Sequence, residues 1–241
     1  DEGLDAPTTL WAYFVVDESL DEKIERVRGY LRALKTSNSE ISPESLAIEI
    51  KQEGDWSENW KSQFKIIRVS DKLTIKPSWE EYSPSDGEVV VEILMGLVFG
   101  NGAHPSTRLC LRALEDVINQ MKVNGDISCV ELLDVGTGSG VLCIAAVKLG
   151  IGRALGIDID LRAVEIARNN TVLNRVQDRV GITNTPLEEI DGKYPIVAAN
   201  ILAPVLIELR NPLLSHLRED GFLILSGILS TRAEDVKSSF S

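Results

Sequence analysis

The segment from Leu133 to Asp160 constrains the fold of this 241-residue chain more than any other part of it. It reads as an apolar strand, a loop with glycine at positions 136, 138 and 140, a helix, and a second strand followed by acidic residues. Chains with this pattern lay a helix N-terminus and a bare backbone against a nucleoside-containing ligand. The segment therefore predicts a βαβ unit with a ligand site at its glycine loop.

The spacing of the glycines indicates which ligand this is. Gly136, Gly138 and Gly140 form GxGxG, whereas dinucleotide-binding loops read GxGxxG, and here Val141 stands at the position of the third glycine. GxGxG after the first strand of a parallel sheet is typical of S-adenosylmethionine sites. We expect Gly136 and Gly138 to take positive φ or to allow close backbone approach. The N–H groups of the loop and helix would then face the methionine carboxylate and the sugar.

Two acidic residues follow the second strand of this unit. Asp158 ends the strand, and a carboxylate there can accept hydrogen bonds from both ribose hydroxyls of a nucleoside. Asp160 is the competing acid, and we expect it to cap the helix that begins at Leu161 instead. The sequence therefore favours Asp158 as the ribose ligand.

Further polar residues are candidates for a reaction site. Asn200 ends the fourth strand, where its side-chain oxygen can accept a hydrogen bond from an incoming amine; the alternative is a helix cap before Pro204. His104 lies in a glycine-flanked loop and either serves the site or only fixes the loop. Thr107 either contributes to the site or is part of a helix cap. His216 is expected on a polar helix face at the surface.

The pattern of apolar and polar residues changes along the chain and predicts three regions. For residues 1–52 the pattern predicts a small α+β substrate-recognition domain with strands at 9–16 and 46–50 and a helix at 20–35. A connector helix is predicted at 53–64. A cofactor-binding domain is predicted at 65–241. The third region should begin with short strands at 65–69, 73–76 and 88–93 and a helix at 106–121.

From residue 130 the alternation of strands and helices is regular. Near-continuous apolar strands between amphipathic helices imply a parallel sheet covered on both faces. Strands are expected near 130–135, 153–158, 179–184, 194–199 and 221–226, and helices near 139–149, 161–174, 204–217 and 230–240.

The composition and net charge of the chain limit the binding partners and the cellular compartment that we expect. A net charge of −12 argues against general nucleic-acid binding, because phosphates would be repelled on average. Cys110, Cys129 and Cys143 show neither paired nor metal-type spacing, which suits a reducing cytoplasm and predicts no metal site. No apolar run is long enough to span a bilayer, so no membrane partner is expected.

Six segments closely resemble the PrmA family, whose members methylate protein eleven of the large ribosomal subunit. The segments are IKPSWEEY (75–82), FGNGAHPST (99–107), LDVGTGSGVLCIAAVKLG (133–150), GIDID (156–160), ANILA (199–203) and LSGIL (225–229). The resemblance implies a class I S-adenosylmethionine-dependent methyltransferase with a Rossmann-like, doubly wound, mostly parallel sheet. It also implies that the substrate is that large-subunit ribosomal protein, methylated on lysine ε-amino or N-terminal α-amino nitrogens.

The resemblance also assigns residues to roles. Thr107, Gly136, Asp158 and Asn200 occupy the family's cofactor-contact positions, and His104 falls in the same active-site loop, so Asn200 and His104 are the catalytic candidates. The family loop usually reads FGTGTHPTT, and here three of its threonines are replaced, by Asn101, Ala103 and Ser106. The family fold continues into an antiparallel hairpin after the last helix, so we expect that hairpin to be missing and the small domain to be incomplete.

Two other functions remain open at the level of the sequence. One is a methyltransferase that acts on a different amine. NILA in place of NPPY argues against enzymes that methylate a flipped base, since Ile201 and Leu202 offer no aromatic ring. Alternatively, the chain is a noncatalytic module that binds the cofactor and docks on a partner. The oligomeric state is not indicated by the sequence.

Overall fold

The computed structural model of the protein describes residues 20–35, 46–48, 65–94 and 104–240. The chain divides into two units, Asp1–Glu58 and Asn59–Ser241, and the division falls within the predicted connector. In the first unit, α1 (Leu20–Lys35) is the amphipathic helix that the spacing predicts. The predicted strand at 9–16 and the connector helix lie outside the described residues, and the domain boundaries stay a prediction.

Residues 46–48 correct part of the predicted strand at 46–50. They belong to no strand or helix, and Ile48 is 49% exposed. Alternating side chains produce a strand only where a neighbouring strand supplies the ladder of backbone hydrogen bonds. No described residue pairs with this segment in a ladder. The rest of the predicted strand lies outside the described residues.

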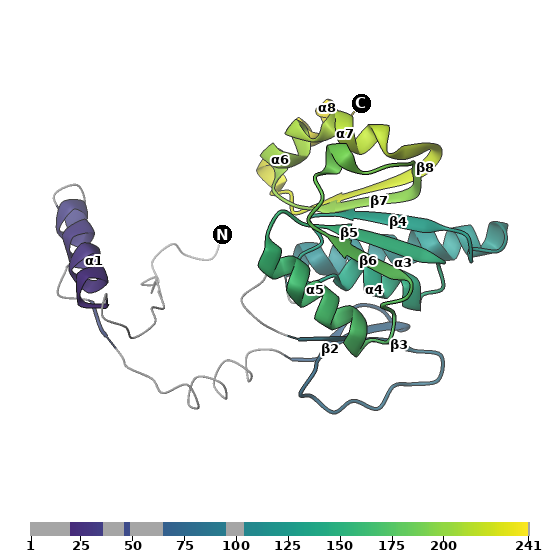
Figure 1. The fold of residues 1–241 in the computed structure, drawn as a ribbon, viewed down its shortest axis with the longest axis horizontal. Coiled ribbons are helices and arrows are strands. Elements are labelled where there is room, and N and C mark those ends of the chain that lie inside the picture. The colour runs from purple at the N-terminus through teal and green to yellow at the C-terminus, as the bar shows by residue number, and fades with distance from the viewer. Residues whose placement is uncertain (1–19, 36–45, 49–64, 95–103, 241) are drawn as a thin grey trace. The chain divides into compact units, whose positions relative to one another are not determined.

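A five-stranded parallel sheet forms the centre of the second unit (Figure 1). Its strands are β4 (Glu131–Val135), β5 (Arg153–Ile157), β6 (Val180–Thr183), β7 (Tyr194–Asn200) and β8 (Leu217–Ser226). They lie in the order β6-β5-β4-β7-β8 and every adjacent pair is parallel, which confirms the predicted Rossmann-like sheet. The strand order reverses between β4 and β7, and ligands of such sheets bind at the carboxyl ends of the strands at that point.

Helices cover both faces of this sheet, as the apolar strands predict. One face is covered by α3 (Pro105–Asn124), α4 (Val141–Lys148) and α5 (Leu161–Leu173). The other face is covered by α6 (Ala203–Glu208), α7 (Arg210–Ser215) and α8 (Ala233–Ser239). Two short 3₁₀ turns are η2 (Leu187–Glu189) and η3 (Ser230–Arg232). Successive side chains of β4 point to opposite faces: Leu132 packs with α3 and α4, whereas Leu133 packs with α6 and α7. None of the helices in the described ranges is long and apolar enough to cross a membrane.

A second, smaller sheet packs against the α4 side of the core. It contains β1 (Ile67–Arg68), β2 (Leu73–Pro77) and β3 (Val89–Ile93), with β1 antiparallel and β3 parallel to β2. Leu73, Ile75 and Ile93 are fully buried in the same apolar cluster as α4. The loop between β2 and β3 is fixed by Glu88. Its carboxylate accepts hydrogen bonds from Thr74 and Tyr82 (both 2.6 Å), and these bonds, with others, lower its pKa to about 2.

The predicted helix at 204–217 is wrong as a single element. It is two short helices, α6 and α7, that meet at Leu209, and Leu217 already belongs to β8. Pro212 has no N–H to donate to the carbonyl of Glu208, so a continuous helix cannot form there. The pairing of β8 with β7 shifts register between Tyr194 and Ile196, and this irregularity lets the strand begin earlier than the sequence indicates.

His216 is buried rather than exposed, which corrects the prediction of a surface residue. It follows α7, and its two ring nitrogens face the carbonyl oxygens of Pro212 and Ile190, each at 2.8 Å. Because α7 is short and packs close to η2, the imidazole fills the junction between them instead of reaching solvent. The helix ends at Ser215, so His216 does not lie on the polar helix face inferred from the sequence.

The turn from α4 into β5 generates a prediction for stability. A Cβ at Gly152 would collide with the carbonyl oxygen of Ser128, a backbone atom that cannot rotate away. We expect Gly152→Ala to lower the free energy of unfolding by about 1–3 kcal/mol, measured by urea unfolding. Gly181→Ala is the control, because its Cβ would meet only the end of the flexible Leu155 side chain at 3.3 Å. Equal unfolding midpoints for the two variants would contradict the packing described.

Candidate active site

The glycine loop makes a sharp turn between β4 and α4. Gly136 and Gly138 have φ of 73° and 54°, which confirms the expected positive φ. The N–H groups of Gly136 and Thr137 donate to the carbonyl oxygen of Ile157 at 2.9 and 3.0 Å. A Cβ at Gly136 would collide with the side chain of Ile201, in the segment after β7. The loop is therefore held between the carboxyl ends of two neighbouring strands.

The helix after the loop begins without a side-chain cap. Gly140 is the N-cap residue of α4, and the helix is buried from Val141 to Val147. An uncapped N-terminus carries N–H groups and the positive end of the helix dipole, which together favour a negatively charged ligand group. This end of α4 therefore suits the carboxylate of a bound methionine.

Asp158 faces the glycine loop from the end of β5. One carboxylate oxygen accepts a hydrogen bond from the N–H of Gly138 at 2.8 Å, and the other accepts one from the N–H of Asp160 at 3.0 Å. Asp160 caps α5 by accepting from the N–H of Arg162 at 2.9 Å, as predicted. A carboxylate has about four acceptor positions, so the half-buried Asp158 keeps capacity for ribose hydroxyls.

Asp134 is a site residue to which the sequence reasoning gave no role. It is fully buried, and one of its oxygens accepts a hydrogen bond from the hydroxyl of Thr137 at 2.6 Å. The other oxygen has no hydrogen-bond partner among the described residues. Burial raises the pKa of this carboxyl to about 7. The signal in the sequence was an acidic residue inside an otherwise apolar strand, since such a residue needs a reason to be there.

Asn200 and Thr107 meet at the carboxyl end of β7. The side-chain N–H₂ of Asn200 donates to the hydroxyl of Thr107 at 3.2 Å, and Thr107 is buried in the first turn of α3. The side-chain oxygen of Asn200 is buried and has no partner among the described residues. Leu202, not Asn200, is the N-cap residue of α6, so the alternative role as a helix cap is wrong. The amide is thus oriented with its acceptor oxygen unused.

His104 is the N-cap residue of α3. Its Nδ1 accepts from the N–H of Ser106 at 3.2 Å and lies 2.7 Å from the hydroxyl of the same residue. The carbonyl of Ser106 in turn accepts from the hydroxyl of Ser226 at 2.9 Å, which ties the start of α3 to the end of β8. These contacts support the plainer alternative, in which His104 fixes its loop. A catalytic role for His104 stays a prediction.

The candidate residues gather at one edge of the sheet. Gly136 and Gly138, Asp158 and Asn200 follow the carboxyl ends of β4, β5 and β7, and Thr107 joins them through Asn200. In the described ranges, no three His, Cys, Asp or Glu side chains are arranged to hold a metal ion. Burial raises the pKa of the Cys110 thiol to about 12 and also raises that of Cys143, so neither is poised as a nucleophile.

Comparisons with known proteins agree with this geometry. The family model described as ribosomal protein L11 methyltransferase (PrmA) matches residues 2–241. The chain belongs to this family. A PrmA relative, the ribosomal protein L11 methyltransferase of Pelobacter propionicus, is 41% identical over 238 residues, covering 99% of this chain and 76% of the relative. The protein of the same name from Geotalea daltonii is 42% identical over 236 residues, covering 97% and 75%.

A solved structure extends the comparison to three dimensions. The ribosomal protein L11 methylase of Lactobacillus delbrueckii subsp. bulgaricus superposes with a TM-score of 0.64 at 33% sequence identity. The match covers 73% of this chain and 85% of that chain. The resemblance of the six sequence segments to the PrmA family is therefore confirmed, and so is the class of fold.

The buried Asp134 generates a prediction for the pH dependence of stability. With its pKa raised to about 7, the folded protein keeps a proton on this carboxyl at pH values where the unfolded chain, with an ordinary pKa of about 3.9, has lost it. Its contribution to the free energy of unfolding is therefore complete below about pH 4 and is lost as the pH rises through about 7. Asp134→Asn should remove this dependence.

Thermal unfolding of both proteins between pH 4.5 and 8 measures this effect. We expect the stability of the native protein, relative to Asp134→Asn, to fall as the pH rises. Asp116→Asn, which removes an exposed carboxylate from α3, is the control for the loss of one negative charge. A difference between native protein and Asp134→Asn that does not change with pH would contradict the raised pKa.

Proposed function

We propose that this chain transfers the methyl group of S-adenosylmethionine to lysine ε-amino or N-terminal α-amino nitrogens of ribosomal protein L11. Membership of the PrmA family and the names of the relatives support the substrate. One structural observation carries the proposal for the chemistry. The buried oxygen of Asn200 has no hydrogen-bond partner among the described residues, and it lies beside a glycine loop with an acid at the end of the next strand. An unpaired buried acceptor is costly, and an incoming amine would satisfy it.

The residues fit the proposed cofactor at several points. Gly136 and Gly138, with φ of 73° and 54°, form a tight turn without side chains, so the ligand could approach the backbone of the loop. Asp158 would accept the ribose hydroxyls, and the uncapped start of α4 would face the methionine carboxylate. When bound, S-adenosylmethionine supplies a methyl group on a cationic sulfur that is already a good leaving group. The task left to the protein is alignment.

Asn200 would align the nucleophile. Its oxygen accepts a hydrogen bond from the amine, which aims the nitrogen lone pair, while its N–H₂ donates to the hydroxyl of Thr107. Holding two reactants in the reactive geometry can supply about 7–11 kcal/mol of the barrier. Both Asn200 and Thr107 sit on regular elements, β7 and α3, so the geometry is fixed before substrate arrives.

A lysine substrate must also lose its proton. With a pKa of about 10.4, the neutral amine at pH 7 costs about 4.6 kcal/mol. A desolvated site and a neighbouring cationic sulfur both disfavour the ammonium form and lower that pKa. The apolar side chains of Ile201 and Leu202, which follow Asn200, contribute to such a site. An α-amino group needs less help, because its ordinary pKa is about 8.

The remaining expectations concern place and partners. We propose that the reaction takes place in the cytoplasm, where unpaired thiols such as the exposed Cys129 stay reduced. The partner is a protein, with no direct contact to nucleic acid, and the net charge of −12 supports this. Ribosomal protein L11 would be bound before or apart from ribosomal RNA.

Transfer of labelled methyl groups to purified ribosomal protein L11 tests the function. We expect label on L11 with the native chain. Asn200→Ala should lower kcat by roughly 100-fold or more and change cofactor Kd by less than about threefold, since the main task of its oxygen is to orient the amine, although Asn200 also stands at a cofactor-contact position. Asn211→Ala, which truncates an exposed asparagine on α7, should match the native chain.

Each other result of this assay has a definite meaning. Label found only on a different amine would mean that this amine, and not L11, is the substrate. Tight cofactor binding without label on any substrate would mean that the chain is a noncatalytic module. Equal, large losses of kcat and cofactor affinity in Asn200→Ala would make Asn200 a cofactor ligand alone.

The role of Asp158 is tested by binding. Asp158→Asn keeps the shape of the side chain but removes its negative charge, so it should weaken S-adenosylmethionine binding by roughly tenfold in calorimetry. Asp160→Asn is the matched control, because asparagine also caps helices well and this side chain is committed to α5. If Asp158→Asn bound the cofactor with native affinity, the ribose assignment would be wrong.

A further inference from the structure

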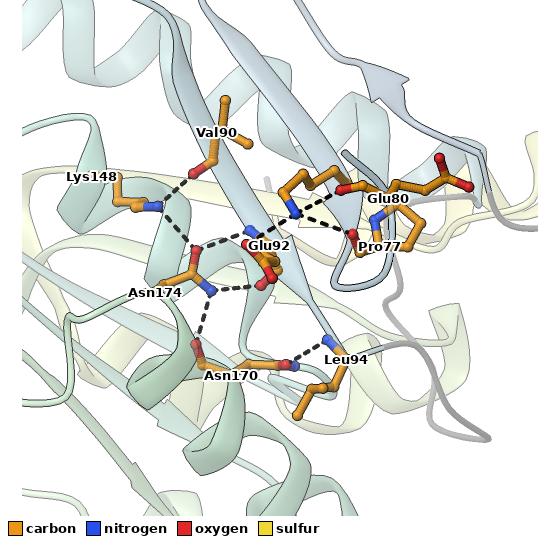
Figure 2. Close-up of polar contacts among 9 residues, drawn as sticks. Pro77, Glu80, Val90, Glu92, Leu94, Lys148, Asn170 and Asn174 are labelled. Atoms are coloured by element: carbon orange, nitrogen blue, oxygen red, sulfur yellow. Dashed lines mark hydrogen bonds and ion pairs between the residues drawn. The ribbon is translucent and has the colours of Figure 1, made fainter. Parts of the chain in front are cut away.

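Two asparagines, Asn170 on α5 and Asn174 at its C-cap, hold the strand β3 at its edge (Figure 2). The side chain of Asn174 accepts a hydrogen bond from the N–H of Glu92 at 2.9 Å and donates one to the carbonyl oxygen of the same residue at 2.6 Å. It therefore bonds both backbone groups of Glu92, as a neighbouring strand would. Asn170 lies one helical turn earlier and accepts from the N–H of Leu94 at 2.8 Å. The pair fastens the small sheet to the methyltransferase core.

Asn170 makes a second contact that Asn174 lacks. Its side-chain N–H₂ donates to the carbonyl oxygen of Ser139 at 2.8 Å. Ser139 stands between Gly138 and Gly140, inside the glycine loop. Asn170 is fully buried, and its bond to Ser139 is made away from water, whereas the bond to Leu94 is part-buried. One side chain thus links the end of β3 directly to the loop.

Most contacts of the Asn174 side chain join the small sheet; one more runs from its N–H₂ to the backbone carbonyl oxygen of Asn170 at 2.8 Å (Figure 2). Lys148 donates to the carbonyl oxygen of Val90 and, at 3.0 Å, to the side-chain oxygen of Asn174 (Figure 2). Lys76 pairs with Glu92 at 3.0 Å. These contacts run from α4 and β2 to β3. Because Asn174 is already held in this cluster, β3 does not need Asn170 merely to stay attached.

We propose that Asn170 is a positioning residue for the cofactor: it orients the Ser139 peptide and so presets the glycine loop, coupling cofactor affinity to the docking of β3. A carbonyl held by Asn170 cannot turn into the ligand space, and its peptide plane fixes the N–H of Gly140 as well. A loop that is already ordered loses less conformational freedom on binding. The inference rests on the proposed use of this loop by S-adenosylmethionine.

Matched variants on α5 separate this role from simple packing. Asn170→Asp keeps the acceptor for the Leu94 N–H but replaces the donor to Ser139 with an oxygen. Asn174→Asp makes the same change of charge and shape one turn away, and keeps the acceptor for Glu92 and Lys148. Asn170→Ala and Asn174→Ala repeat the comparison without an added charge.

Calorimetric titration with S-adenosylmethionine is the measurement, since its stoichiometry reports the folded fraction separately from Kd. We expect both Asn170 variants to raise Kd at least tenfold and both Asn174 variants to raise it less than twofold, while all four lower the melting temperature of the cofactor-free protein. In steady-state assays the Asn170 effect should appear in KM for the cofactor rather than in kcat. Native Kd in the Asn170 variants, or equal losses in the Asn174 variants, overturns the inference.

A measurement on the native chain covers the case in which the Asn170 variants do not fold. Coupling is reciprocal, so binding of S-adenosylmethionine must stabilise the Asn170–Leu94 contact. Amide hydrogen exchange at Leu94 should therefore slow on adding the cofactor, and an unchanged rate overturns the proposal. If the native chain binds no S-adenosylmethionine at all, the proposed function fails with it, whereas native binding with insensitive Asn170 variants removes only the positioning role.

Discussion

The turn from β4 into α4 is the constraint on which the rest of the site depends. Two successive N–H groups, of Gly136 and Thr137, donate to the same carbonyl of Ile157, and Ile201 occupies the space where a side chain at 136 would stand. These contacts hold the carboxyl ends of β4, β5 and β7 next to one another. Gly136, Gly138, Asp158, Asn200 and Thr107 take their positions from this turn, since each follows one of these strands or bonds to a residue that does.

The candidate site contains buried polar atoms that make no hydrogen bond to the described residues. One oxygen of Asp134 and one of Asn200 are buried without a partner among the described residues, although the strands around them are otherwise apolar. Such groups each cost about 1–3 kcal/mol. A fold selected for stability alone would fill these positions with apolar side chains. Their presence at the switch point of the sheet is what we expect of a site that a ligand completes.

Sequence patterns were reliable where local chemistry sets the structure. The alternation of apolar strands and helices predicted the sheet, and Asp160 was recognised as a cap because capping involves neighbours in the chain. The pattern failed where a local break or a contact between elements decides. Pro212 divides a helix that hydrophobic spacing alone would join, and His216 is buried because α7 ends beside η2. Asp134 stands inside an apolar strand, which is a signal in the sequence, but its unpartnered oxygen is visible only in the packed core of the described residues.

The sequence by itself determined the class of sheet, the glycine loop, the acid after β5 and membership of the PrmA family, because each is written in a short run of neighbouring residues. Only the tertiary structure decided which atoms meet. The side-chain N–H₂ of Asn200 donates to Thr107, 93 residues away, which leaves the side-chain oxygen without a partner among the described residues. Asn170 joins Ser139 and Leu94 across 31 and 76 residues. Hydrogen bonds over such separations depend on how helices pack on the sheet, and no local pattern encodes that geometry.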